Sequence, residues 1–150
     1  MSTDQGTILL VEDNSKDVLL IKRAFHKANI CNSLQVVNNG DAAVSYLSGG
    51  EPYSDRTLYP LPVLMLLDLK LPRRSGAEVL MWLRQQPELK RLPVVVLTSS
   101  KEYADVNLVY DLGVNAYIVK PFAFNDLLEI VKTLNLHWII FNEKPYIGAN

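Results

Sequence analysis

The sequence predicts an α/β protein built on a doubly wound, five-stranded parallel sheet. Three observations support this fold class. Five short apolar runs recur along the chain, a helical pattern follows each run, and a polar residue ends each run abruptly. Strands that are apolar on both faces are typical of a parallel sheet that helices cover on both sides. The length of 150 residues fits one such domain.

The first strand and its helix show the pattern most clearly. Residues 8–11 are wholly apolar and the polar residues 12–14 follow at once, so a buried strand is predicted there. Apolar side chains at spacings of three and four then predict an amphipathic helix to about Asn29. A second strand is predicted at residues 34–37. Asp41 is expected to cap the helix that follows it, and the Gly49-Gly50 pair is expected to end that helix.

The rest of the chain repeats the pattern after one long loop. Residues 51–62 hold three prolines and two tyrosines without periodicity, which predicts a loop that is either functional or merely tolerated. The remaining strands are expected at residues 63–67, 94–97 and 116–119. The remaining helices are expected through residues 78–83, up to residue 112 before Gly113, and from residue 124 to about 137.

Composition and charge exclude several classes of function. The formal net charge is −1, with 15 basic and 16 acidic side chains. No basic arm is present, so direct binding of nucleic acid is not expected. The one cysteine, Cys31, cannot form an intrachain disulfide, and residues 1–6 lack a signal-peptide pattern. No apolar run approaches the roughly 18 residues that span a bilayer. A soluble, cytoplasmic protein is therefore expected.

Charged and hydroxyl side chains stand at the carboxyl ends of four predicted strands. They are Glu12 and Asp13 after the first strand, Asp68 after the third, Thr98 and Ser99 at the fourth, and Lys120 after the fifth. The carboxyl ends of parallel strands meet at one edge of the sheet, where open α/β sheets bind their ligands. We therefore expect these residues to lie together in space.

The three carboxylates point to a divalent cation. Clustered carboxylates raise one another's pKa unless a cation compensates their charge. Oxygen ligands suit Mg²⁺, which keeps several waters and often completes its shell with a phosphate oxygen. With Mg²⁺ and Lys120, the formal charge of Glu12, Asp13 and Asp68 is balanced. A phosphoryl group could then be accepted, and Asp68, at the end of the most apolar strand, is the predicted nucleophile.

In this order and spacing the motifs resemble the receiver domain of two-component response regulators, the CheY-like family. The motifs are Glu12-Asp13, Asp68 followed by Leu71-Pro72 and Ser75-Gly76, Thr98-Ser99, and Tyr117 with Lys120-Pro121. Each motif alone is weak, whereas the ordered set is specific. The resemblance spans about residues 7–136 and implies a flavodoxin-like sheet with strand order 2-1-3-4-5.

The resemblance implies roles at the phosphoryl site and at a switch. Asp68 would be the phosphoacceptor, and Thr98 and Lys120 would bind phosphoryl oxygens. Tyr117 would be the aromatic switch, which turns inward when Thr98 moves toward the phosphoryl group. The peptide bond before Pro121 would be cis, an otherwise minority geometry.

The resemblance also implies a metal site and draws attention to two departures from the family. Asp13, Asp68 and the backbone carbonyl of Lys70 would bind Mg²⁺ directly, and Glu12 would hold a metal-bound water. Ser99 stands where the family often has alanine, and its hydroxyl should take up little space beside the phosphoryl group. The Lys70 side chain could cover the path of the hydrolytic water, which predicts slow loss of the phosphoryl group.

Structural readings of these residues and two other function classes remain open. Each acid, Thr98 or Lys120 could alone be a helix cap, a turn residue or a solvated side chain. A metal-dependent hydrolase that uses an aspartyl phosphate would generally need a second acid where Lys70 stands. A flavin-binding module would need a turn rich in Gly, Ser and Thr after the first strand, and that turn is acidic.

Apolar residues beyond the needs of the core predict an interface between two copies of the chain. In the fourth helix Tyr103, Val106 and Tyr110 share a face opposite the core stripe, and Leu128 of the last helix also points away from the core. Receivers often dimerise through these two helices and the fifth strand. A two-fold homodimer is therefore expected.

The chain is expected to act by binding to other proteins. The expected divisions are a tail at residues 1–6, a receiver domain at 7–137 and an extension at 138–150. The extension is too short for an output domain. The long loop and aromatic tail resemble stand-alone regulators paired with cyanobacterial phytochrome histidine kinases. The phosphoryl donor would be such a kinase, which Lys16, Ile21 and Phe25 of the first helix would help to dock.

Overall fold

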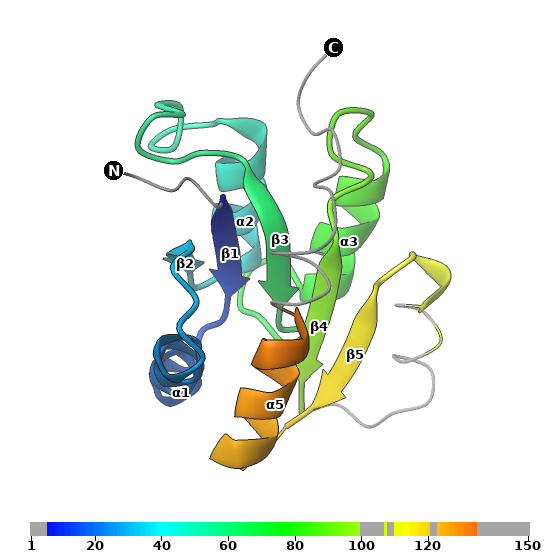
Figure 1. Ribbon diagram of the computed structural model, residues 1–150. Helices are drawn as coiled ribbons and strands as arrows, with labels where there is room; N and C mark the ends of the chain where they lie inside the picture. The colour runs from blue at the N-terminus through cyan, green and yellow to red at the C-terminus, as the bar shows by residue number, and fades with distance from the viewer. Residues whose placement is uncertain (1–5, 100–106, 108–109, 121–122, 135–150) are drawn as a thin grey trace.

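The strands form one five-stranded parallel sheet in the order β2-β1-β3-β4-β5 (Figure 1). The computed structural model describes residues 6–99, 107, 110–120 and 123–134. The strands are β1 (Thr7–Val11), β2 (Ser33–Val37), β3 (Pro62–Leu67), β4 (Val94–Thr98) and β5 (Ala116–Val119). The predicted fold class and strand order are confirmed.

Helices cover both faces of this sheet (Figure 1). One face carries α1 (Ser15–Lys27) and α5 (Phe124–Leu134), and the other carries α2 (Gly40–Ser48) and α3 (Gly76–Arg84). Most of the helix expected before Gly113 lies outside the described residues. Within the described part of the chain, no helix has the length and apolar character needed to cross a membrane.

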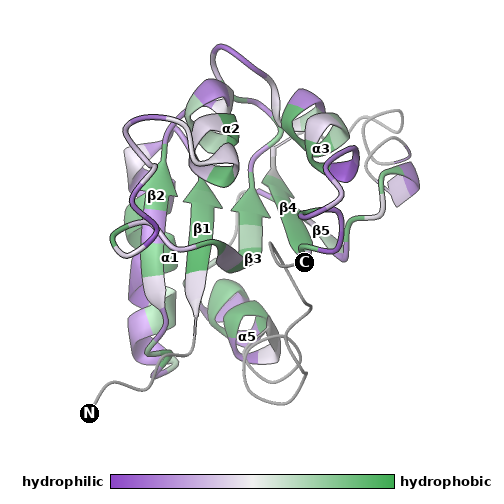
Figure 2. Cartoon of the chain, turned by 90° about the horizontal axis from the view of Figure 1, so that it is seen from above, coloured by the Kyte–Doolittle hydropathy of each residue, from purple (hydrophilic) through white to green (hydrophobic). Residues whose placement is uncertain are grey.

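Two hydrophobic cores form because successive strand residues point to opposite faces. Leu9 and Met65 belong to the core under α2 and α3, whereas their neighbours Ile8 and Leu64 belong to the core under α1 and α5. Figure 2 shows β3 and β4 in the colour of apolar residues and the helices with mixed faces. The edge strands β2 and β5 are only partly buried, unlike the prediction for them, because each has a neighbouring strand on one side only.

The second helix begins earlier than the sequence predicts. Asn39, and not Asp41, is its N-cap, because the Asn39 side chain accepts a hydrogen bond from the Ala42 amide at 2.7 Å. Asp41 lies in the first turn, where it accepts a hydrogen bond from Arg74 at 3.2 Å. The predicted end is correct, since Gly49 closes the helix in the left-handed conformation, at φ 78°.

The long loop before β3 is anchored from inside by aromatic residues and one arginine. Tyr46 of α2 is fully buried, and its ring centroid lies 5.2 Å from that of Tyr53 and 6.0 Å from that of Tyr59. The Tyr46 hydroxyl donates to the Pro60 carbonyl at 2.8 Å. Arg56 donates to the carbonyls of Tyr46 and Tyr59 at 2.8 and 3.0 Å. This loop is therefore a packed part of the fold at the amino end of the sheet.

Candidate functional site

Backbone hydrogen bonds hold the carboxyl ends of β1 and β3 at the same level. The Glu12 amide donates to the Val37 carbonyl, and the Asp68 amide donates to the Val11 carbonyl, both at 3.0 Å. The parallel ladder thus continues one residue past β1 and β3. Glu12 and Asp68 are buried, with 1% and 5% of their surface exposed, whereas Asp13 is exposed. The edge of the sheet therefore holds two acids inside and one at the surface.

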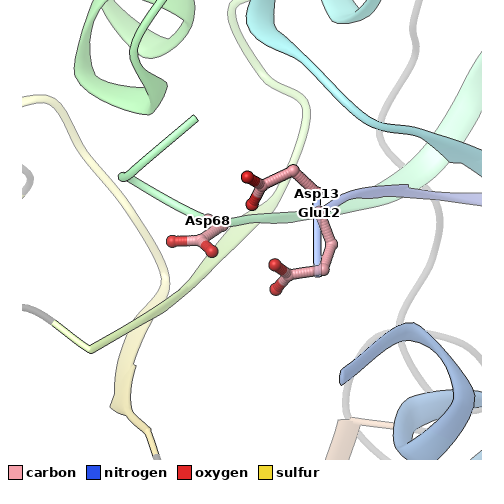
Figure 3. Close-up of side chains that lie close together, drawn as sticks. All are labelled: Glu12, Asp13 and Asp68. Carbon is pink, nitrogen blue, oxygen red and sulfur yellow. The ribbon is translucent and has the colours of Figure 1, made fainter. Parts of the chain in front are cut away.

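The three predicted carboxylates form one cluster. One carboxylate oxygen from each of Glu12, Asp13 and Asp68 lies within 4.8 Å of the others. Figure 3 shows these carboxylates extending to the same side, from the end of β1 and from the end of β3. The topology thus brings together residues that are far apart in the sequence, as the strand pattern predicts.

Lys120 reaches this cluster from the end of β5. Its ammonium lies 2.5 Å from Glu12 Oε1, 2.8 Å from Asp17 Oδ2 and 3.0 Å from Asp68 Oδ2. Lys120 is itself only 9% exposed. One buried cation is therefore shared by three carboxylates, of which two were predicted from the sequence.

The carboxylate that sequence analysis missed is Asp17. It lies in the first turn of α1, four residues after Asp13. Acidic residues are common in first turns because they complement the helix dipole. The only signal in the sequence was this helical spacing, which does not reveal whether the side chain turns toward Lys120 or toward solvent.

Burial and charge displace the pKa values of two groups in the cluster. Burial raises the pKa of Glu12 from 4.5 to about 7, the charge of Asp68 raises it further, and Lys120 opposes the rise. Burial alone would lower the pKa of Lys120. Its hydrogen bonds to Asp17, Glu12 and Asp68 outweigh that effect and raise the Lys120 pKa above its ordinary range. The predicted mutual repulsion of the acids therefore contributes at Glu12, but burial is the larger cause.

The turn after β3 fixes the Asp68 side chain. Asp68 Oδ1 accepts a hydrogen bond from the Lys70 amide at 3.0 Å, while Oδ2 faces Lys120. A Cβ on Gly76 would lie 2.3 Å from the Asp68 carbonyl oxygen, so only glycine fits where α3 begins. The Lys70 side chain is exposed. That it covers the path of the hydrolytic water and slows the loss of a phosphoryl group stays a prediction.

The predicted switch and interface residues are only partly described. Tyr117 of β5 is half-buried, and its ring centroid lies 6.4 Å from that of Tyr110, which is 52% exposed. Leu128 on α5 is half-buried and Ser99 is exposed. The Thr98 side chain, Tyr103, Val106 and Pro121 lie outside the described residues.

The prediction that Ile21 and Phe25 dock a partner is wrong. Both side chains lie in the core under α1 and α5, with 1% and 5% of their surface exposed. They follow the same periodic stripe that buries α1 against the sheet. The exposed apolar residue of this helix is Leu19, at 52%.

The donor set fits a hard divalent cation. Within the described residues, the cluster offers carboxylate oxygens and neither imidazole nor thiolate, which suits Mg²⁺, Mn²⁺ or Ca²⁺ better than Zn²⁺. The site holds four carboxylates, Asp17 included, and the ammonium of Lys120 pairs with three of them. The site therefore carries excess negative charge that a cation would offset, and the exposed Asp13 leaves room for waters in its shell.

Comparison with known proteins finds one family along most of the chain. The family model described as the response regulator receiver domain matches residues 8–132. Response regulator Rcp1 of Synechocystis sp. is 39% identical over 138 residues, which cover 92% of this chain and 92% of Rcp1. The probable methanogenesis regulatory protein FilR2 of Methanothrix harundinacea is 37% identical, over 95% of this chain and 89% of that protein.

Solved structures give the same result. The phosphorylated cyanobacterial phytochrome response regulator RcpA superposes with a TM-score of 0.84 at 38% identity, covering 93% of this chain and 98% of RcpA. The Mn²⁺-bound form of Rcp1 superposes with a TM-score of 0.83 at 38% identity, covering 93% and 99% of the two chains. A relative with this fold thus holds a divalent metal.

Proposed function

Since this chain belongs to the response regulator receiver domain family, we propose that Asp68 accepts a phosphoryl group from a histidine kinase and that this alters the protein's contacts with other proteins. Members of the family are signalling phosphoacceptors and not classical enzymes. The proposed chemistry is limited to the chain's own phosphorylation and dephosphorylation. The hydrolase and flavin alternatives have no observation in their favour.

The observation that carries this proposal is the setting of Asp68. It is 5% exposed, its Oδ2 lies 3.0 Å from the Lys120 ammonium, and its carboxylate lies within 4.8 Å of those of Glu12 and Asp13. An oxygen nucleophile beside a fixed cation and a cation-binding acid cluster is what phosphoryl transfer requires.

The proposed reaction forms an acyl phosphate. An Asp68 carboxylate oxygen attacks phosphorus in the phosphohistidine donor, an O–P bond forms, and the P–N bond breaks with its electron pair left on the imidazole nitrogen. Lys120 offsets the negative charge of the transferred group, and the Thr98 hydroxyl donates to a phosphoryl oxygen. A divalent cation, when bound, would supply further positive charge to the phosphoryl oxygens.

We assign the metal site to Asp13, Asp68 and the backbone carbonyl of Lys70, which would bind the ion directly, while Glu12 would hold a water of its shell. Mg²⁺ is the proposed ion, because all the candidate donors are oxygens. The hydrogen bond from the Lys70 amide to Asp68 Oδ1 supports this assignment, since it keeps the backbone of residue 70 close to the carboxylate. The Mn²⁺-bound form of a relative is also in keeping with it.

The proposed output is a changed surface. Thr98 moves toward the phosphoryl group, Tyr117 turns inward, and the face containing Tyr110 and Leu128 changes its affinity for a second copy of the chain. The 6.4 Å contact between the Tyr110 and Tyr117 rings supports a link between switch and surface. Light scattering at high concentration should detect a dimer. A monomer with and without a phosphoryl mimic would contradict this part of the proposal.

The proposed donor is a cytoplasmic histidine kinase of the phytochrome type. Support comes from relatives named as phytochrome response regulators, with 38% identity over nearly the whole length of RcpA. FilR2, whose identity to this chain is 37%, is instead named as a probable methanogenesis regulatory protein. The phosphohistidine chemistry is common to any kinase of this class, so the acceptor reaction does not depend on which signal the kinase senses.

The test is phosphorylation with acetyl phosphate and Mg²⁺, read by intact mass. The wild type should gain one phosphoryl group, and Asp68→Asn should gain none because its amide is not a nucleophile. Asp126→Asn is the matched control, since Asp126 is an exposed acid in the first turn of α5, and it should react like the wild type. Equal modification of Asp68→Asn would refute the assignment.

A further inference from the structure

The hydrogen bonds of Lys120 leave its ammonium no hydrogen to spare. An ammonium donates three hydrogens, and Lys120 has three acceptors, Glu12 Oε1, Asp17 Oδ2 and Asp68 Oδ2, at 2.5, 2.8 and 3.0 Å. If Lys120 is to bind a phosphoryl group on Asp68, it must redirect hydrogens that it now gives to carboxylates. Redirecting only the bond to Asp68 would provide one hydrogen for a doubly charged group.

The burial of its partners decides which other bond Lys120 can release. The Glu12 side chain is 0% exposed, so no bulk solvent could replace the ammonium hydrogen bond that its carboxylate would lose if Lys120 turned away. The Asp17 side chain is 24% exposed and sits in the first turn of α1, where water and the helix dipole can stabilise its charge. Asp17 is therefore the carboxylate that Lys120 leaves at the lower cost.

Charge acts in the same direction. Phosphorylation replaces the single negative charge of Asp68 with a group that carries more. Asp17, held 2.8 Å from Lys120, is then a neighbouring anion that competes with the phosphoryl group for the same cation. Its presence favours the unphosphorylated state.

We propose that Asp17 is a positioning residue that holds Lys120 in the resting protein and is exchanged for the phosphoryl group on activation. This inference rests on the proposed function of Asp68. Asp17 thereby lowers the affinity of the site for a phosphoryl group while keeping Lys120 in place between phosphorylation events.

The test measures the affinity for beryllofluoride, a phosphoryl mimic, by ¹⁹F NMR at saturating Mg²⁺. Asp17→Asn preserves the shape of the side chain and removes its charge. We expect it to bind beryllofluoride about threefold to tenfold more tightly than the wild type, the range expected for a partly exposed charge interaction. A residue that only stabilised α1 would not tighten binding when replaced.

Two matched variants separate this effect from others. Asp126→Asn removes the same charge from the first turn of α5, and we expect its beryllofluoride affinity to stay within about twofold of the wild type. Asp17→Glu keeps the carboxylate and should bind like the wild type. If Asp17→Asn binds no more tightly than Asp126→Asn, or if Asp17→Glu also binds more tightly, the proposal is overturned.

A structure of the wild type with Mg²⁺ and beryllofluoride tests the exchange without any variant. The distance between Lys120 and Asp17 should open from 2.8 Å to beyond ion-pair range, while Lys120 keeps Glu12. Retention of the Asp17 contact would overturn the proposal. Failure of the wild type to bind beryllofluoride would overturn the proposed function as well, whereas normal wild-type binding with an unchanged Asp17→Asn would overturn this inference alone.

Discussion

The two ends of the sheet hold a cationic side chain in opposite ways, with Lys120 buried at the carboxyl end and Arg84 half-buried at the amino end. At the carboxyl end, the Lys120 ammonium is bound by the carboxylates of Glu12, Asp17 and Asp68. At the amino end, the Arg84 guanidinium is bound by backbone carbonyls. These are the carbonyls of Leu112, Lys90 and Gly113 at 2.8 Å and of Leu92 at 3.1 Å.

The loop at the amino end follows the same rule as Arg84. Arg56 donates to the carbonyls of Tyr46, Leu47 and Tyr59 at 2.8 to 3.0 Å. A backbone carbonyl is neutral and keeps the same charge as conditions change. A carboxylate can be protonated, phosphorylated or bound by a metal. The amino end is therefore built to stay as it is, and the carboxyl end to change partners.

The largest effect should come from replacing the glycine at the carboxyl end, Gly76. In Gly76→Ala the new Cβ would lie 2.3 Å from the Asp68 carbonyl oxygen, so the acceptor turn or the start of α3 must shift. We expect a loss of about 3 kcal/mol in unfolding free energy, together with loss of beryllofluoride binding. Urea unfolding and ¹⁹F NMR measure the two effects.

Gly50→Ala is the control at the amino end. Its Cβ would find its nearest neighbours at 3.7 Å, which is ordinary contact. Its unfolding free energy should stay within about 0.5 kcal/mol of the wild type, with unchanged beryllofluoride binding. Normal binding by Gly76→Ala would show that the acceptor turn tolerates displacement, contrary to the geometry.

A smaller effect, confined to stability, is expected for Arg84→Met. Loss of the guanidinium leaves four carbonyls to find other donors and should lower the unfolding free energy by about 2 kcal/mol in urea. Beryllofluoride affinity should not change. Arg84→Lys should recover only part of the loss, because one ammonium cannot match the forked guanidinium. A change in affinity larger than twofold would mean that the two ends are coupled.

The smallest effect is expected for Tyr46→Phe, which removes the hydrogen bond to the Pro60 carbonyl and should lower the unfolding free energy by about 1 kcal/mol.

The same variant should change how stability depends on pH. Burial raises the pKa of the Tyr46 phenol from 10.0 to about 12. A phenol that is harder to ionise in the folded state contributes stability below pH 10, and this contribution is lost as the pH rises from about 10 to about 12. Unfolding in urea across this range should show a smaller decline for Tyr46→Phe. Parallel declines would contradict the assignment.

The elements of the fold could be predicted because their signals are local. The apolar runs and their polar ends gave each strand to within a residue or two, and Gly49 marked the end of α2. The strand order was not visible in periodicity and came from the resemblance. The cap of α2 was assigned wrongly, since Asn39 and Asp41 are both good capping residues and only the backbone path selects between them.

The candidate site was predictable in part, because topology alone gathers residues at the strand ends. Glu12, Asp68 and Lys120 are brought together in this way. Asp17 was missed because its position in the first turn of α1 does not reveal whether its side chain turns toward Lys120 or toward solvent. Phe25 was assigned to a docking surface although its spacing from Ile21 already places it on the apolar stripe that faces the core.

The internal anchoring of the loop before β3 has a practical consequence. Its shape depends on inward-facing Tyr46 and Arg56, whereas Leu58 projects outward with 62% of its surface exposed. A cysteine or fluorophore introduced at Leu58 would therefore be held by a well-packed loop at the amino end of the sheet, opposite the acid cluster at the carboxyl end. Paired with a second dye near the acids, it would serve as a fixed reference against which activation movements are measured by energy transfer.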